Sequence, residues 1–598
     1  MSNTEHGALA PADDNLVDAE EGEGEDDDTE QLRKHWTQAL ATEGKPTWVL
    51  PNPFKRYGWG RYDSEDWGPQ PLTVFELTMC ELSWTLRSKP DWQRKAADPE
   101  IRSKWRKEAL EQQEGEEQAL TEKMVDYVLV ELEGYANIAD SERGIERACF
   151  DGIWYTDKVF TTDLRERLKT AVKVLEDVPE DKKDWHPGSN NQVLDLFHPS
   201  LYCIVYDRTH AYFPRKHRVA ENFVPVPSPV SNSPTYTSDK FCWLPSDFTV
   251  NDEGSVKLVS PYINNLDPYL HRSAYAVIEE VLGGFIPLFE RVLGDSDREQ
   301  GREPFSHTKR LQQPIDCIWG DDEKPEPDDE PPSDEDDEEF YEKFYASCPK
   351  TYPEAQEYTR QLEANFKPVS LRGRTIQCII KLANIHLTPS RPNYEGGSWH
   401  VEGMANEQIV ASGIYYYDEE NITESELSFR VAVGEPVYHG QEDGLCMNAL
   451  YGMEKGSDLV QDLGSVVTKE GRALSWPNLF QHCVSPFELA DTEKPGHRKI
   501  LAIFLVDPAK DPIVSATHVP PQQDGWTADA FQEACMDPQS LLGVLPQELR
   551  DLIKENFPPT IMTLKEAQAY RLELMKERTA SVKEHDRDYV QSFNMCEH

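Results

Sequence analysis

The residues best suited to chemistry are a histidine and a glutamate two positions apart, His400 and Glu402. On an extended strand, side chains two positions apart point to the same side, so this imidazole and this carboxylate can hold one metal ion together. The best candidate for a third ligand is His482, which lies just before a hairpin-like loop. Two histidines and one carboxylate leave half of an octahedron open, which is the arrangement associated with non-heme Fe(II) oxygenases. The sequence therefore predicts a metal site formed by His400, Glu402 and His482.

An iron oxygenase that uses 2-oxoglutarate also needs a cation for the distal carboxylate of that cosubstrate. Arg498 lies sixteen residues after His482, at the start of the apolar stretch 500–505. Because a guanidinium can hold a carboxylate through two parallel hydrogen bonds, we predict that Arg498 is this clamp. Lys381 and Asn384 are further candidates for contact with the cosubstrate, and a structural hydrogen bond is the alternative role for both.

Other polar residues in this stretch have structural interpretations. Arg430 is a second candidate for the clamp, although the acidic residues near it favour a salt bridge. We interpret His386 as a core histidine and Glu407 as a residue that holds a turn. The three tyrosines 415–417 are typical of a central strand that packs on both of its faces.

Composition and net charge limit the kinds of molecule that this protein is expected to bind. The chain has 598 residues and a net charge of -48. Residues 1–30 and 321–339 carry about half of that excess, and the rest of the chain is still strongly acidic. Such a body repels phosphates and anionic lipids, so we expect no nucleic-acid partner and no membrane partner. A basic protein remains a possible partner for the acidic segments, and the substrate is expected to be a small molecule or a protein.

The cysteines and the N-terminal residues indicate in which cellular compartment the protein is expected. Eleven cysteines are scattered singly, without a C-x-x-C pair, which fits a reducing environment better than a disulfide framework or a structural zinc site. The N-terminal stretch is acidic and has no apolar segment typical of a signal peptide. No apolar run approaches the ~20 residues that span a bilayer. We therefore expect a soluble, intracellular protein of the cytoplasm or nucleus.

Changes in composition divide the chain into five parts. Residues 1–45 are expected to be disordered and acidic, and 320–340 to be an acidic disordered linker or insertion. Between them, 46–319 reads as mainly helical with some strands. Residues 341–520 are expected to form a jelly-roll core with the candidate oxygenase site, and 521–598 a helical C-terminal region.

Local patterns support this division. The capping box that begins at Thr73 starts one helix, and a second box at Thr563 starts a long charged helix up to about Tyr589. Asp267 and Pro268 favour the start of another helix. Two glycines should end that helix at about Leu282, and a new helix should begin at Pro287. The turn 251–254 predicts a hairpin between two strands.

Short strands separated by turn residues are dense between residues 370 and 520. The predicted fold is therefore α+β, with an all-β barrel or jelly roll packed against the helical parts. The predicted strands are 375–381, 409–417, 427–433, 464–467, 473–476 and 500–506.

A family resemblance rests on several motifs. They are Lys381-Leu-Ala-Asn-Ile-His-Leu-Thr-Pro389, Tyr394-Glu-Gly-Gly-Ser-Trp-His-Val-Glu-Gly403, Asn406-Glu407, Tyr415-Tyr-Tyr-Asp418 with Asn421-Ile422, Leu427-Ser-Phe-Arg430, Trp185-His-Pro-Gly188, Trp243-Leu-Pro-Ser246 and Tyr262-Ile-Asn-Asn-Leu266. Over roughly residues 60–520 the chain resembles the fungal family catalogued as domain of unknown function 4246.

That family in turn resembles the Fe(II)/2-oxoglutarate dioxygenase superfamily. The resemblance implies a double-stranded β-helix core, with His400, Glu402 and His482 as iron ligands and Arg498 as the clamp for 2-oxoglutarate. It also implies hydroxylation or demethylation of a substrate C–H bond. The chain departs from the commoner superfamily pattern in having glutamate instead of aspartate as the second ligand, and in the greater distance between the distal histidine and the basic clamp.

Two alternative functions remain open at this point. The spacing of Gly471, Pro477 and His482 resembles the second motif of the cupins, although Leu479 stands where a glycine is expected and Glu402 where a histidine is usual. A cupin-like metalloprotein would use the same architecture for another reaction. The other alternative is an inactive barrel that acts as a scaffold for a basic partner.

Overall fold

The structure of the protein is a computed structural model. It describes residues 27–54, 69–116, 118–212, 223–230, 235–297, 310–312, 317–320, 324–327, 337–436, 440, 443–557, 560–589 and 592–593. The predictions made for residues 1–26, 321–323 and 328–336 lie outside this described part.

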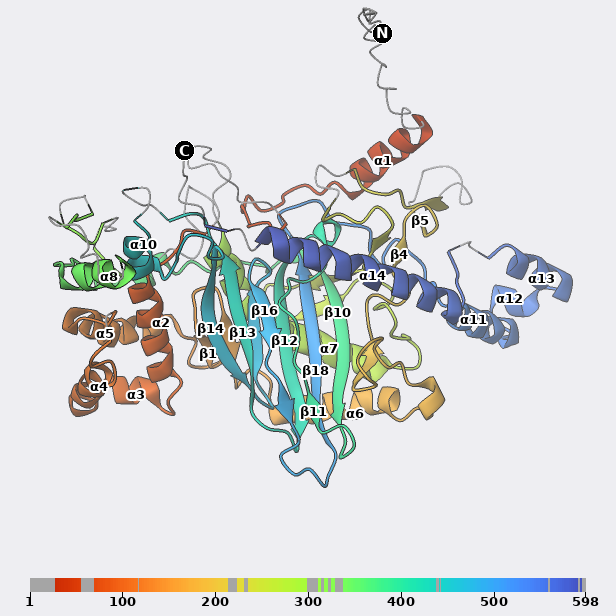
Figure 1. Ribbon diagram of the computed structural model, residues 1–598. Coiled ribbons are helices and arrows are strands. Elements are labelled where there is room, and N and C mark those ends of the chain that lie inside the picture. Colours follow the sequence, from red (N-terminus) through yellow and green to blue (C-terminus); the bar gives the residue numbers. More distant parts are fainter. Residues whose placement is uncertain are drawn as a thin grey trace, which may run out of the picture.

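A nine-stranded antiparallel sheet forms the centre of the described fold (Figure 1). The strand order is β1-β2-β15-β12-β18-β10-β8-β9, and β3 pairs with β10 off this path. The bounds are β1 Ile145–Arg147, β2 Trp154–Thr156, β3 Val193–Phe197, β8 Ser246–Val250, β9 Val256–Leu258, β10 Arg374–Leu387, β12 Ile409–Glu420, β15 Ala473–Pro477 and β18 Gly496–Val506.

A second, three-stranded sheet packs against one face of the large sheet. It has the order β14-β13-β16, with β13 Ser425–Ala432, β14 Val460–Thr468 and β16 Gln481–Val484. Ile414 and Trp476 of the large sheet belong to the same buried apolar cluster as Leu427 and Phe429 of the small one. We call the face of the large sheet that meets the small sheet the inner face, and the opposite face the outer face.

Three strand pairs complete the described β-structure. They are β4 Ile204–Val205 with β7 Phe241–Cys242, β5 His210–Tyr212 with β6 Phe223–Pro225, and β11 Asn393–Tyr394 with β17 Phe487–Glu488. The strands predicted between residues 370 and 520 are all present as β10, β12, β13, β14, β15 and β18. The predicted hairpin is also confirmed, because β8 and β9 pair across a turn in which Asn251 donates its N–H to the Ser255 carbonyl.

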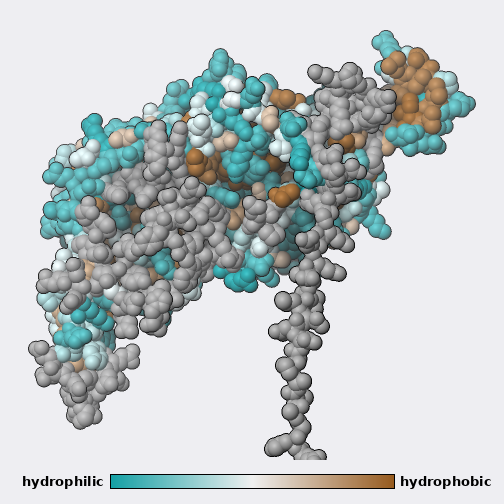
Figure 2. Space-filling view, turned by 90° about the horizontal axis from the view of Figure 1, so that it is seen from above, coloured by the Kyte–Doolittle hydropathy of each residue, from teal (hydrophilic) through white to brown (hydrophobic). Residues whose placement is uncertain are grey.

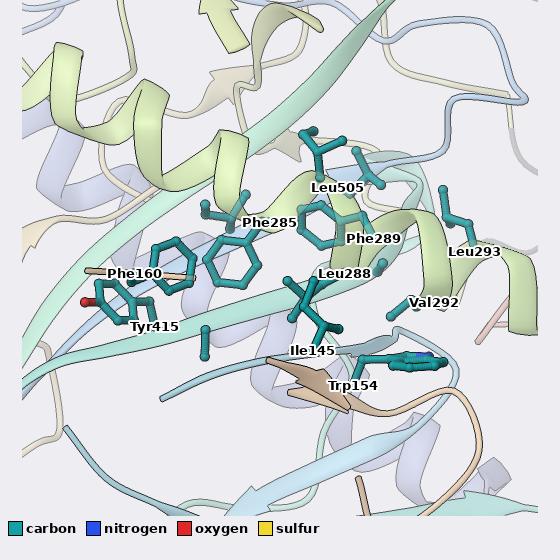
Figure 3. Packing of buried hydrophobic residues seen from close by; sticks show 14 of the residues in the cluster. Ile145, Trp154, Phe160, Phe285, Leu288, Phe289, Val292, Leu293, Tyr415 and Leu505 are labelled. Carbon is teal, nitrogen blue, oxygen red and sulfur yellow. The ribbon is translucent and has the colours of Figure 1, made fainter. Parts of the chain in front are cut away.

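The helix α7, Arg272–Ser296, covers the outer face. Figure 3 shows Phe285 and Phe289 of this helix pointing to the sheet, with Phe285 beside Phe160 and Tyr415. The ring centroids of Phe160 and Tyr415 are 4.3 Å apart. The predicted helix start at Asp267–Pro268 is wrong, because the helix begins at Arg272. The predicted break is also wrong, because the helix continues through the two glycines and Pro287.

Packing explains why α7 is not interrupted. A Cβ on Gly284 would lie 2.5 Å from Cε1 of Phe160, so the glycine allows close approach and does not end the helix. Glycine and proline cost about 1 and 3 kcal/mol in a helix interior, and the apolar face buried by a 25-residue helix outweighs both.

Gly413 of β12 supplies a test of this packing. A Cβ there would lie 2.7 and 2.8 Å from two ring carbons of the fully buried Phe285. We expect Gly413→Ala to lower the free energy of unfolding by about 1–3 kcal/mol through overpacking. Urea unfolding measures this, with Gly444→Ala as the control, since nothing lies within 4 Å of that added Cβ. Equal stability of the two variants would contradict the expectation.

Helices α2 to α6 form the N-terminal part of the fold (Figure 1). Their bounds are α2 Val74–Arg87, α3 Trp92–Ala96, α4 Pro99–Gln112, α5 Glu122–Ile138 and α6 Thr162–Glu176. The predicted capping box is confirmed, because the Thr73 side chain accepts from the Glu76 N–H and the Glu76 carboxylate accepts from the Thr73 N–H. Shorter helices are α8 Asp337–Ser347, α9 Gln361–Asn365 and α10 Gly444–Tyr451, with 3-10 turns at Glu180–Lys182 and Ala405–Glu407.

Two terminal elements differ in how well the sequence predicts them. Helix α1, Asp27–Leu40, lies where we expected disorder, and its Trp36 is buried and donates to the Pro225 carbonyl. The long C-terminal helix α14, Leu564–Tyr589, agrees with prediction. It lies across one end of the two sheets in Figure 1, where Asp586 pairs with Arg430 of β13 at 2.6 Å.

Three further helices form a lobe that packs little. They are α11 Asp524–Met536, α12 Leu541–Val544 and α13 Gln547–Glu555, and none of them has a buried side chain. Figure 2 shows hydrophobic residues gathered at the end of the molecule that carries this lobe. The exposed apolar residues there are Met536, Leu541, Val544, Leu549, Leu552 and Ile553.

The described helices also bear on membranes. None of those in the described part of the chain combines the length and the apolar character that a membrane crossing requires.

Candidate metal centre

His400, Glu402 and His482 converge as the sequence predicts. Nε2 of His482 lies 3.4 Å from Oε1 of Glu402, and Nε2 of His400 lies 3.7 Å from the same oxygen. One ligand atom from each of the three residues lies within 4.8 Å of the other two. These separations allow one ion to contact all three side chains at once, since metal–ligand bonds are about 2.0–2.2 Å.

The backbone brings the two histidines together. His482 lies in β16, and an isolated antiparallel bridge joins it to His400, with His482 N–H donating to the His400 carbonyl at 3.0 Å. Apart from this bridge, the segment that carries His400 and Glu402 is irregular and lies beside the small sheet. The regular strand expected there is absent. Their side chains still share one side, because the bridge fixes the extended conformation locally.

Asn478 fixes the position of the glutamate. Its side chain accepts from the Glu402 N–H at 2.8 Å and donates to the Glu402 carbonyl at 2.9 Å. It is fully buried and also donates to the Ile409 carbonyl. Sequence patterns do not single out this asparagine, since its role depends on a contact across 76 residues.

The hydrogen bonds of His400 select its metal-binding atom. Nδ1 of this ring donates to the Ser398 carbonyl at 2.7 Å, which leaves the lone pair of Nε2 for an ion. In His482, Nε2 faces Glu402, and Nδ1 is buried without a hydrogen-bond partner. Trp476 packs on this second ring with centroids 4.8 Å apart, which restricts its orientation.

The protonation states suit a cation. Burial acts to raise the pKa of Glu402, but its interactions with the adjacent imidazoles of His400 and His482 hold that pKa well below its usual value. Burial lowers the pKa of His482 to about 4. Burial also acts to lower the pKa of His400, but the Glu402 carboxylate outweighs it and raises that pKa. At neutral pH the site therefore presents an ionised carboxylate and at least one neutral imidazole.

The raised pKa of His400 predicts the pH dependence of metal binding. A proton on Nε2 competes with the ion, so affinity should fall as the pH drops through a pKa above 6.5, by up to about tenfold per pH unit. Titration with Mn(II) between pH 5.5 and 8 measures this. His497→Gln serves as control, because that histidine pairs with Asp418 away from the triad. A flat profile would contradict the assignment of His400 as a ligand.

Arg498 lies on the inner face but is already paired. It is 1 % exposed and stands opposite Ile385 of β10. Its Nη2 and Nε donate to the Glu419 carboxylate at 2.8 and 3.1 Å, and its Nη1 donates to the Ser425 hydroxyl. The guanidinium is also 4.6 Å from the ring centroid of Phe487. A carboxylate of this chain thus occupies the partner position that we predicted for the cosubstrate.

Lys381 is the second cation of the inner face. It stands opposite Ala502, four residues before Ile385 along β10, which places it about 13 Å along the strand from Arg498. Its charge acts to lower the pKa values of His400 and His482, so it lies within electrostatic reach of the triad. Within the described part of the chain, neither a hydrogen bond nor an ion pair engages its ammonium group.

Asn384 lies on the opposite side of the sheet. It donates to Glu176 of α6 at 2.7 Å and accepts from the Tyr417 hydroxyl at 3.2 Å. Because strand side chains alternate, Lys381 and Asn384 face opposite ways. Of the two alternatives for Asn384, the structure therefore shows the structural hydrogen bond.

The other sequence interpretations can also be compared with the structure. Arg430 pairs with Asp586 and Gln481. His386 is half-buried, and burial lowers its pKa to about 4. Glu407 holds a turn as predicted, because its carboxylate accepts from the N–H groups of Met404 and Trp243.

The triple tyrosine packs on both faces. Tyr416 belongs to the inner cluster, while Tyr415 and Tyr417 belong to the cluster around α7.

The chain belongs to the family described as protein of unknown function DUF4246, which it matches over residues 122–530. The N-terminal domain of the same family, also of unknown function, matches residues 31–108. No curated protein matches the chain.

Several solved structures show a limited similarity. One is an Fe(II)/(alpha)ketoglutarate-dependent dioxygenase, TqaL, at 11 % identity and a TM-score of 0.21, with 60 % of this chain and 95 % of that chain covered. Another is IDO from Bacillus thuringiensis, at 9 % identity and a TM-score of 0.15, with 22 % and 46 % covered. AviO1 from Streptomyces viridochromogenes Tue57 has 15 % identity and a TM-score of 0.14, with 26 % and 60 % covered. The chain thus spans less than half of IDO, and similarities this small do not assign an activity.

Proposed function

We propose that the protein is an Fe(II)- and 2-oxoglutarate-dependent dioxygenase that hydroxylates or demethylates a substrate. The observation that carries this proposal is the convergence of His400, Glu402 and His482 on one point. Two imidazoles and one carboxylate are the donor set of a facial Fe(II) site. The two facing antiparallel sheets would then be the double-stranded β-helix core expected for such enzymes.

The protein residues have separate tasks in this proposal. His400 Nε2, Glu402 and His482 Nε2 would hold the iron, whose chemistry when bound is the coupling of 2-oxoglutarate decarboxylation to oxidation of a C–H bond. Ser398 fixes the tautomer of His400, and Asn478 fixes the backbone of Glu402. Trp476 covers His482 with apolar surface and itself packs against Phe429, which excludes water from that side.

Arg498 would bind the distal carboxylate of 2-oxoglutarate, and Glu419 must then give up its hydrogen bonds to the guanidinium. We expect Glu419→Gln to lower the Kd for 2-oxoglutarate by roughly tenfold, because it removes a competing charge. Arg498→Gln should weaken binding by at least about 100-fold. Isothermal titration of the Mn(II)-loaded variants measures both. If Lys381→Met loses binding while the two other variants keep it, the clamp is Lys381.

The proposed function has a direct spectroscopic test. Purified protein is mixed anaerobically with Fe(II) and then with 2-oxoglutarate, and we expect a visible metal-to-ligand charge-transfer band. The band should be absent in Glu402→Ala and retained in Asp418→Asn, whose carboxylate pairs with Lys169 and His497. A wild-type protein that binds Fe(II) without the band would favour the cupin-like alternative. A folded protein that binds no metal would favour the scaffold.

A further inference from the structure

A second cluster of metal-ligand side chains lies in the described part of the chain, outside the triad. It consists of His186, Asp195 and His198, with one ligand atom of each within 4.8 Å of the others. Asp195 lies in β3 and pairs with Ala383 of β10. The proposed dioxygenase reaction assigns no role to this cluster.

The register places Asp195 on the inner face. Paired residues of neighbouring strands project to the same side of a sheet, and Ala383 has the same orientation as Lys381, two residues earlier. Val193, two residues before Asp195, packs in the same apolar group as Ile385. The cluster therefore lies on the inner face, which meets the small sheet that carries His482.

Lys381 lies within electrostatic reach of both groups. Its charge acts to lower the pKa values of Asp195 and His198, as it does those of His400 and His482. Lys381 and Asp195 do not form an ion pair, so the Lys381 ammonium group is more than 4.0 Å from the Asp195 carboxylate.

The hydrogen bonds argue against a second metal site. Nδ1 of His198 accepts from the Ser200 N–H at 3.1 Å, so the neutral ring carries its proton on Nε2. If Nε2 of His198 bound a metal ion, the ring proton would have to move to Nδ1. The Nδ1–H group would then point at the Ser200 N–H, and the hydrogen bond between them would be lost. Burial lowers the pKa of His198 well below its usual value, so this ring is neutral at pH 7.

Asp195 is an ionised carboxylate with one free oxygen. His186 Nδ1 donates to Oδ2 at 2.7 Å, whereas Oδ1 is buried and has no hydrogen-bond partner. Burial acts to raise the pKa of Asp195, but the two histidines and Lys381 outweigh it and hold that pKa at about 2. A buried charged oxygen without a donor costs free energy, and a ligand that supplies a charged N–H group recovers it.

Building on the proposed function, we propose that Asp195 binds a protonated nitrogen of the substrate, such as an alkylammonium group. A charge-assisted hydrogen bond to Oδ1 would anchor that nitrogen on the inner face of the large sheet, which meets the small sheet that carries His482. His186 positions the carboxylate and leaves Oδ1 free. The substrate class is then an amine that is protonated at neutral pH, which includes lysine side chains and small alkylamines.

The test compares charged and neutral probes on one protein. Mn(II)-loaded protein with 2-oxoglutarate is titrated with n-butylamine, 1,4-diaminobutane and N-acetyl-lysine methylamide at pH 7, and with their N-acetylated, uncharged counterparts. Binding is followed by isothermal titration and thermal shift. We expect at least one amine to bind at least tenfold more tightly than its acetylated counterpart, and Asp195→Asn to remove that preference. Asp195→Glu, which keeps the charge, should retain part of it.

Several outcomes would overturn the inference. These are an absence of any preference for the amines up to 10 mM, an equal preference in Asp195→Asn, or a second Mn(II) per chain that is lost in Asp195→Asn. Failure of the proposed function is a different result, since it would show as a missing charge-transfer band in wild-type protein. Circular dichroism of Asp195→Asn, with Asp195→Glu beside it, separates lost binding from lost folding.

Discussion

Replacing His482 by alanine is expected to abolish tight metal binding and the proposed oxygenase activity. The ring is buried, its Nε2 lies 3.4 Å from Glu402, and Trp476 packs against it. Changes in residues that only orient ligands typically cost 10–100-fold in affinity, so loss of a ligand should cost at least about 100-fold. Mn(II) titration followed by EPR measures the free ion directly.

Asn478→Ala provides the graded comparison. It removes the two hydrogen bonds that fix the Glu402 backbone while leaving every ligand atom in place. We expect about a 10–100-fold loss of affinity, smaller than that of His482→Ala. If His482→Ala binds Mn(II) as tightly as the wild type, or more tightly than Asn478→Ala, the ligand assignment is wrong.

Replacing Asp295 by alanine is expected to have the largest effect on stability. This carboxylate, 2 % exposed near the end of α7, accepts from Arg147 of β1 at 2.8 Å, from Trp154 Nε1 of β2 at 2.8 Å and from the Gly152 N–H at 3.2 Å. Its loss leaves the buried Arg147 guanidinium with Asp151 as its remaining carboxylate partner. Breaking such a buried pair costs about 3–5 kcal/mol.

Urea unfolding followed by tryptophan fluorescence measures this cost. The matched control is Glu280→Ala, which removes an exposed ion pair with Arg167 at 2.6 Å and should cost less than about 1 kcal/mol. The account of how α7 is fixed to the sheet would be contradicted if the two variants lost the same amount of stability.

The triad shows what sequence spacing can and cannot supply. Period-two spacing was sufficient to place His400 and Glu402 on one side, even though the segment is not a regular strand. The contribution of His482 followed from residue type and chain order. The supporting residue Asn478 could not be found in this way, because only the fold brings its amide to the Glu402 backbone.

For Arg498, the predicted clamp, the sequence indicates the location but not the partner. Arg498 was selected by its chemistry and its position at a strand end, and it does lie on the inner face. Its pairing with Glu419 follows from an irregularity in β12, where the register against β18 shifts between Tyr416 and Asp418. A sequence pattern carries no signal for such a bulge.

Helix boundaries failed where packing outweighed local preference. Gly283 and Gly284 suggested a break in α7, yet Gly284 allows the close approach of Phe160 to a continuous helix. Likewise, α1 has the charge typical of disorder, but Trp36 anchors it in a pocket beside β6. Both errors have one cause, namely long-range burial that the local sequence does not encode.

The most direct measurement of the central claim is the position of the metal itself. A crystal of the protein soaked anaerobically with Fe(II) should give one anomalous difference peak per chain at the iron absorption edge. The account predicts this peak within bonding distance of His400 Nε2, a Glu402 carboxylate oxygen and His482 Nε2. A peak among other residues, or no peak in a crystal whose three side chains are ordered as described, would contradict it.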